Sequence, residues 1–159
     1  MKVKVNKKSI SSTRLLDSVL GLLDDCNKTC GVDNVDYTDQ KVYSTAALLV
    51  SACMEARNVA HKFHLQTRNH ATHISLDIFY KNVVELVDSF AECYQGRYGV
   101  QDYPRFEWDV ENPIDFINKL IVFIDNNRAY CGSQQDLQAK IDDIQNLNNQ
   151  TLYRLTNLS

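Results

Sequence analysis

Five side chains with metal-binding chemistry lie at regular spacings in the middle of the sequence. His73 and Asp77 are four residues apart, Asp88 and Glu92 are four residues apart, and His64 precedes both pairs. In a helix this spacing places both members of each pair on one face. Imidazole and carboxylate ligands in this mixture suit iron, manganese or zinc. The pattern predicts a metal site made of His64, His73, Asp77, Asp88 and Glu92.

Within a single helix the two ligand pairs lie too far apart to bind one metal ion. At 1.5 Å per residue, Asp77 and Asp88 are about 16 Å apart along a helix axis. Two antiparallel copies crossing near Val83 and Val84 would instead set His73 and Asp77 of one chain opposite the later Asp–Glu pair of the other. The spacing therefore predicts a homodimer through this helix, with two identical sites.

Apolar periodicity predicts the helices that position these residues. Four stretches show the three- and four-residue spacing of bundle helices, and they cover about residues 38–66, 71–95, 113–130 and 134–158. The first is predicted to begin at an N-cap formed by Thr38 or Asp39, and the second to end at Gly96. Asn112 and Pro113 are typical of an N-cap followed by the first helical position. The fold class is therefore all-α, with a four-helix bundle in residues 38–159.

Two further segments complete the predicted organisation. Residues 1–37 are expected to hold a tail and a short extra helix that ends near Cys26. The stretch from Gly96 to Glu111 is long enough, at about 50 Å fully extended, to cross the whole bundle. Such a long crossover is the ferritin-like arrangement, although a simple up-down-up-down bundle is compatible with the same length. Trp108 in this stretch is expected to hold the crossover against the bundle.

Charge and composition limit the partners. The net charge of -3 and the pI near 5.7 argue against a globally basic nucleic-acid binder. Any DNA contact is expected to be weak and to come from Lys2, Lys4, Lys7 and Lys8, for which a solvated chain end is the alternative. The five cysteines show no CxxC pair, which favours reduced thiols in a cytoplasmic protein. No apolar run reaches the roughly 18 residues of a membrane span, and no signal peptide is indicated.

The same five residues also carry a resemblance to a known family. His64-Leu65, His73-x-x-x-Asp77-x-x-Tyr80 and Asp88-x-x-x-Glu92 together resemble the ferroxidase signature of the Dps family, the miniature ferritins that protect DNA during starvation. In that family the two histidines and the first aspartate come from one subunit, and the later Asp and Glu come from its neighbour. The resemblance implies a ferritin-like bundle whose dimers can assemble into a larger shell.

The sequence departs from that family at a few points. Leu65 stands where the family usually has a tryptophan, and the turn before His73 is about three residues shorter. The Glu-x-x-His pair of larger ferritins is absent, since Asn58 follows Glu55 at that spacing. The chain also resembles an uncharacterised ferritin-like family found largely in tailed phages. That resemblance implies a phage-encoded or virion-associated protein in a bacterial host.

Two functions from different classes follow from these observations. In the first, the protein is a Dps-like ferroxidase that oxidises Fe(II) with peroxide or O₂ at the intersubunit site, which would sequester iron and protect against oxidative stress. In the second, it is a non-catalytic helical structural or virion-associated protein with a vestigial metal site. Oxidation of added Fe(II), measured together with the mass in solution, distinguishes the two.

Overall fold

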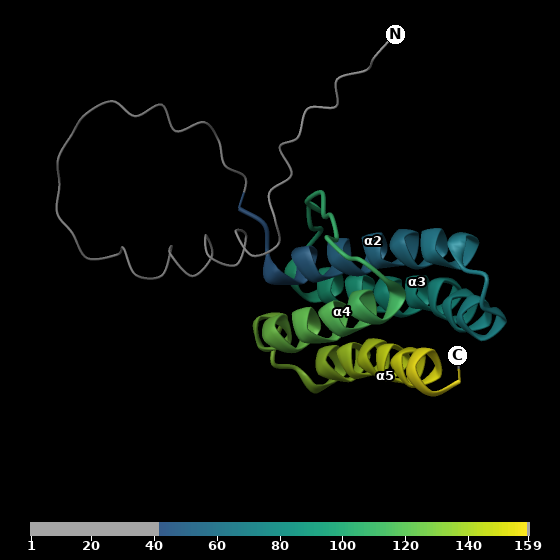
Figure 1. Cartoon of the computed structure of the whole chain (residues 1–159). Helices are drawn as coiled ribbons and strands as arrows, with labels where there is room; N and C mark the ends of the chain where they lie inside the picture. The colour runs from purple at the N-terminus through teal and green to yellow at the C-terminus, as the bar shows by residue number, and fades with distance from the viewer. Residues whose placement is uncertain (1–41, 159) are drawn as a thin grey trace, which may run out of the picture. The chain divides into compact units, whose positions relative to one another are not determined.

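Four α-helices make up most of the chain that the computed structural model describes, residues 42–158 (Figure 1). The helices and one short 3-10 helix are α2 (Thr45–Gln66), α3 (His70–Tyr98), α4 (Pro113–Asn127), η1 (Arg128–Tyr130) and α5 (Gln135–Asn157). No strand occurs within these described residues, so the all-α prediction is confirmed. The expected N-terminal helix and the four lysines near the N-terminus lie outside them, and the chain divides into two units between Lys41 and Val42.

The helix ends follow local capping chemistry, and two of the predicted ends are wrong. The first helix begins at Thr45, because the Ser44 hydroxyl accepts a hydrogen bond from the Ala47 N–H at 3.1 Å. The second helix continues through Gly96 to Tyr98, and its C-cap residue Gly99 has a φ of 83°, which glycine adopts without strain. The predicted cap at Asn112, followed by proline, is confirmed.

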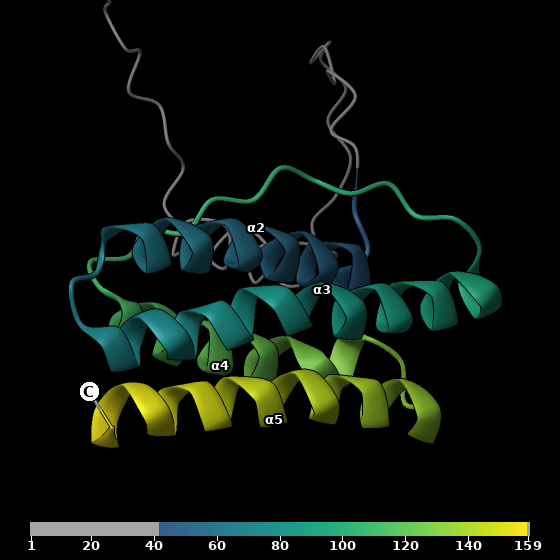
Figure 2. The same cartoon turned by 90° about the vertical axis from the view of Figure 1, so that its right-hand side faces the viewer.

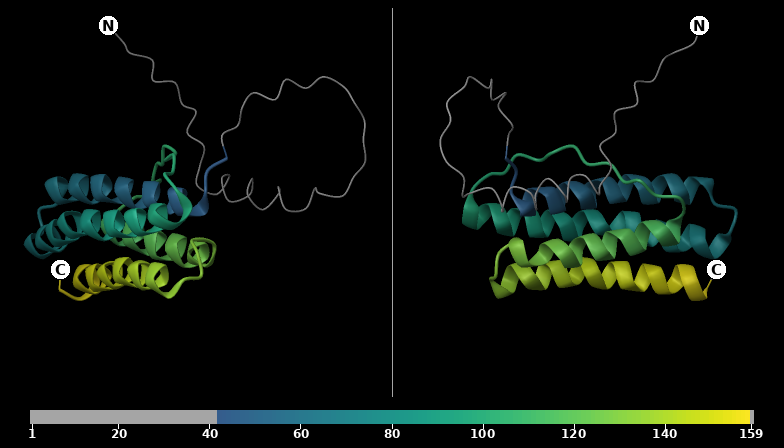
Figure 3. Two further views of the ribbon diagram at one scale, coloured as in Figure 1. Left: turned by 180° about the vertical axis from the view of Figure 1, so that it is seen from behind. Right: turned by 60° about the vertical axis from the view of Figure 1, so that its left-hand side comes forward.

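The chain path places antiparallel helices side by side. The α2–α3 and α4–α5 connections are short turns, whereas residues 99–112 run from the end of α3 along the bundle to the start of α4 (Figure 2). As a result α3 and α4 point the same way, as the further views also show (Figure 3). The main packing pairs are α2 with α3, α3 with α5, α5 with α4 and α4 with α2.

The core between the helices is apolar and tightly filled. Apolar spacing in the sequence predicts an inward seam on α2 made of Leu49, Cys53, Ala56, Ala60 and Phe63. The first four are fully buried, and Phe63 is partly buried against the core. Opposite them lie fully buried large side chains of the other three helices, including Phe79, Phe90, Phe116, Leu120, Leu137 and Ile141. Burial of this apolar surface is the main contribution to the stability of the bundle.

The crossover is attached to the bundle by aromatic side chains. The Trp108 indole N–H donates to the Ala52 carbonyl of α2 at 2.9 Å. The Trp108 ring also lies 5.6 Å from the ring of Phe123 and 5.0 Å from that of Phe106. The predicted role of Trp108 is confirmed, whereas Tyr103 remains 43% exposed.

None of the helices in residues 42–158 is both long enough and apolar enough to cross a membrane.

Candidate metal centre

The turn between α2 and α3 brings the two predicted histidine ligands together. The Thr67 N–H closes α2 by donating to the Phe63 carbonyl at 3.0 Å. The Asn69 side chain then caps α3 by accepting from the Thr72 N–H at 3.0 Å. This tight connection places His64 in the last turn of one helix next to His73 in the first turn of the other.

His64 and His73 bind each other in a reciprocal way. Nδ1 of His64 lies 3.0 Å from the His73 carbonyl oxygen, and Nδ1 of His73 lies 3.0 Å from the His64 carbonyl oxygen. The two rings stack, with centroids 3.7 Å apart and planes 24° from parallel. Because a carbonyl oxygen only accepts, each Nδ1 must carry the proton and donate it. In the neutral rings both Nε2 atoms are therefore unprotonated, which is the form that binds a metal ion.

Further aromatic and basic groups surround this histidine pair. His61 is half-buried and stacks on the Tyr80 ring, with the ring centroids 4.4 Å apart. The Tyr80 ring also meets His64 edge-on at 5.2 Å, and the Arg57 guanidinium lies 5.9 Å from its centre. These residues lie against one side of the pair, and only 8% of His64 is exposed.

Asp77 is the third predicted ligand, and each oxygen of its carboxylate accepts one hydrogen bond from a neighbour on its own helix. The Lys81 ammonium donates to Oδ2 at 2.6 Å, and the Tyr80 hydroxyl donates to Oδ1 at 2.7 Å. These hydrogen bonds, the Lys81 one first, lower the pKa of Asp77 below its usual value. The hydrogen bond to Asp77 in turn raises the pKa of both Tyr80 and Lys81.

Asp88 and Glu92 lie farther along α3, and both are exposed. Within residues 42–158 no three His, Cys, Asp or Glu side chains are grouped closely enough to hold a metal ion. The structure thus brings His64 and His73 into contact and connects Asp77 to them through Tyr80. Asp88 and Glu92 lie away from these three residues. One chain provides two separate halves of the predicted site.

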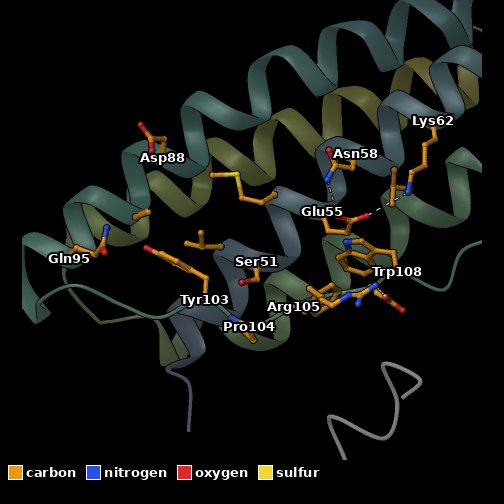
Figure 4. Close-up of a pocket in the computed structure, with 16 residues that line it drawn as sticks. Ser51, Glu55, Asn58, Lys62, Asp88, Gln95, Tyr103, Pro104, Arg105 and Trp108 are labelled. Atoms are coloured by element: carbon orange, nitrogen blue, oxygen red, sulfur yellow. Dashed lines mark hydrogen bonds and ion pairs between the residues drawn. The ribbon is translucent and has the colours of Figure 1, made fainter. Parts of the chain in front are cut away.

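A groove of about 770 Å³ lies beside Asp88, in the second half of the predicted metal site (Figure 4). Its walls are α2, α3 and the crossover, and its lining includes Met54, Glu55, Lys62, Asp88, Tyr103 and Arg105. The Ser51 hydroxyl also lines it and is buried without a hydrogen-bond partner among residues 42–158. Sequence reasoning missed this groove because its third wall depends on the path of the crossover.

Lys81, Tyr80 and His61 are the site residues that sequence reasoning did not identify as functional. The spacing of Asp77 and Lys81 is itself a signal, since an acid and a base four residues apart pair on a helix. Tyr80 is part of the motif that resembles the Dps signature, but its bond to Asp77 is visible only in the structure. His61 gave no usable signal by itself.

The described chain is thus an all-α four-helix protein with paired histidines at one hairpin. Over residues 64–155 it matches the profile of a family of unknown function (DUF5856). The chain belongs to that family, since the match spans more than half of its length.

One relative comes from a bacteriophage. The chain is 27% identical over 122 residues to the "Uncharacterized 14.6 kDa protein in mobD-ri intergenic region" of Enterobacteria phage T4. The matched region covers 76% of this chain and 95% of the phage protein. The similarity supports the predicted link to phages. No solved structure matches the chain.

Proposed function

We propose that two copies of this chain bind Fe(II) at a shared site and oxidise it, as in Dps-like miniature ferritins. The observation that carries the proposal is the reciprocal bonding of His64 and His73. It presents two unprotonated Nε2 atoms from adjacent helices in fixed orientations. Positioned imidazoles with a defined tautomer are what a first-row metal site requires.

The topology supports the same assignment. A four-helix bundle with one long crossover and two short turns is the ferritin-like arrangement. Asp77 and Asp88 lie on the same helix, the first half-buried and the second exposed, with Val84 between them and 37% exposed. Val83 is fully buried in its own chain, so the two-fold contact would centre on Val84.

The proposed dimer supplies the missing carboxylates. With two copies of α3 antiparallel about Val84, Asp88 and Glu92 of one copy approach His73 and Asp77 of the other. Imidazole and carboxylate ligands together suit Fe(II), and the carboxylates compensate the extra positive charge of Fe(III).

The chemistry balances with hydrogen peroxide as the oxidant. Two Fe(II) ions, the substrate, each lose one electron, and peroxide takes both electrons and two protons to give two molecules of water. The contribution of the chain is to bind and orient: the His64 and His73 Nδ1–H groups donate to carbonyls and so hold their rings in place.

Complementation between two variants tests the shared site. His73→Ala breaks one half of each site, and Asp88→Asn breaks the other half. Each variant by itself should lose peroxide-dependent Fe(II) oxidation, measured by the rise of ferric absorbance. In an equal mixture half of the dimers are mixed, and each of these contains one intact site, so about a quarter of the wild-type activity should return.

Two results would contradict the proposal. If both variants fold but their mixture stays inactive, the halves do not meet between chains. If the wild-type protein neither binds nor oxidises Fe(II), the second candidate function applies, a non-catalytic helical structural or virion-associated protein. One observation favours that candidate: His64 and His73 already bond to each other's backbone across the hairpin, and each Asp77 oxygen accepts a hydrogen bond on its own helix, so these contacts form without a metal.

A further inference from the structure

We propose that Lys81 takes the place of the metal ion at Asp77 in the metal-free protein, and thereby sets how tightly the metal binds. This inference rests on the proposed metal site and identifies what regulates it. The Lys81 ammonium lies 2.6 Å from Asp77 Oδ2, which is within hydrogen-bonding and ion-pairing distance.

The geometry makes Lys81 a direct competitor of the metal. With the Tyr80 hydroxyl 2.7 Å from Oδ1, each oxygen of the Asp77 carboxylate accepts one hydrogen bond. The carboxylate keeps further lone pairs for a metal ion, so the competition between Lys81 and the metal is electrostatic. Of the two donors, Lys81 is the one that must leave, because its positive charge repels a divalent cation at this distance.

Lys81 is also free to leave. Its side chain is 59% exposed, and among residues 42–158 the contacts of its ammonium are the Asp77 carboxylate and, at 5.8 Å, the face of the Tyr80 ring. Swinging into solvent therefore breaks one exposed ion pair and disturbs no core packing. Metal binding then exchanges one cation for another at the same carboxylate.

An Asp–Lys pair elsewhere in the chain provides a matched control. Lys119 lies four residues after Asp115 on α4, and its ammonium donates to Asp115 Oδ2 at 2.9 Å. The helical spacing and the surface exposure are similar, but the four histidines of the chain all lie on α2 and α3. Lys119→Met removes the same kind of ion pair without touching the proposed site.

The first measurement uses the metal-free protein. The pKa of Asp77 is followed by NMR in the wild type, in Lys81→Met and in Lys119→Met. The pKa of Asp77 should rise towards its ordinary value in Lys81→Met, because the strongest hydrogen bond to its ionised form is gone, and should not change in Lys119→Met. An unchanged pKa in Lys81→Met would overturn the inference, whatever the fate of the metal site.

The second measurement titrates the same proteins with Co(II), whose visible absorbance reports imidazole and carboxylate binding. Lys81→Met should bind Co(II) on the order of fivefold more tightly than the wild type, because the competing cation is absent. Lys81→Arg and Lys119→Met should bind as the wild type does.

The outcomes separate the inference from the proposed function. Equal affinities in the wild type and Lys81→Met would overturn the role of Lys81 and leave the metal site standing. If no protein binds Co(II), including Lys81→Met, both the site and the inference are wrong.

Discussion

The pair of His64 and His73 connects two helices by a ring stack and two hydrogen bonds from side chain to backbone, so its stability contribution is measurable without any metal. Replacing His64 by alanine removes the ring stack, one hydrogen bond and the packing of a side chain that is only 8% exposed. We expect His64→Ala to lower the free energy of unfolding by about 1–3 kcal/mol, measured by urea denaturation.

His70 provides the comparison for this change. It lies at the start of α3 and is exposed. His70→Ala should change the free energy of unfolding by less than about 0.5 kcal/mol. Similar losses for the two variants would show that the reciprocal contact does not stabilise the hairpin.

Acid stability should depend on Asp136, the residue that joins the start of α5 to the end of α3. The Arg97 guanidinium hydrogen bonds to Asp136 and holds the pKa of its carboxyl below the usual value. As the pH falls below about 4, the unfolded chain takes up a proton before the folded one. The stabilisation is therefore present above that pH and is lost as the pH falls through the lowered pKa.

Urea midpoints between pH 6 and pH 2 test this dependence. Asp136→Asn should show a shallower fall in the midpoint with acid than the wild type does. Asp143→Asn, on an exposed residue of the same helix, should follow the wild-type curve. Identical curves for all three proteins would show that the Arg97–Asp136 pair is absent in solution.

At the scale of the elements, replacing glycine by alanine should have opposite effects on stability at Gly132 and at Gly96. Gly132, in the turn between η1 and α5, has a φ of 95°, and a Cβ there would lie 2.8 Å from Gln134 Oε1 and from Leu137 Cδ1. Gly132→Ala should lower the free energy of unfolding by about 1–3 kcal/mol, because the left-handed backbone strains any other residue.

Gly96 lies inside α3 with open space around it. Gly96→Ala should raise the free energy of unfolding by about 0.5–1 kcal/mol, since alanine favours the helix. Thermal melts of the two variants would show shifts of opposite sign, and a stabilised Gly132→Ala would contradict the strain argument.

At the scale of the whole molecule, the predicted dimer depends on the exposed face of α3. Val84 lies next to the proposed two-fold axis, where each copy faces its own symmetry mate. Val84→Glu would place two like charges opposite each other, which disfavours association. We expect analytical ultracentrifugation to find a dimer for the wild type, of about twice 18.2 kDa, and a monomer for Val84→Glu.

Val122 is the matched control, because it is 56% exposed on α4, away from the proposed contact. Val122→Glu should remain a dimer, and circular dichroism should show that both variants keep their helices. A monomeric wild type would contradict the dimer and the shared metal site together.

Local features of the sequence were sufficient to predict the helices and the division of the site. Apolar spacing identified the α2 seam, and Asn112 with Pro113 marked the start of α4. The separation of Asp77 from Asp88 followed from the rise of the helix alone. Such features are readable because backbone capping and side-chain periodicity act over only three or four residues.

The end of α3 and the detail of the site were decided by tertiary structure. Both Gly96 and Gly99 could end a helix, and α3 continues past Gly96 to Tyr98, with Gly99 as its C-cap. The reciprocal bonds of His64 and His73 join atoms nine residues apart across a turn. One wall of the groove beside Asp88 is the crossover, which the Trp108 bond to Ala52 attaches to α2. These contacts join groups that are distant along the chain, and their geometry is set by how the whole bundle buries its apolar surface.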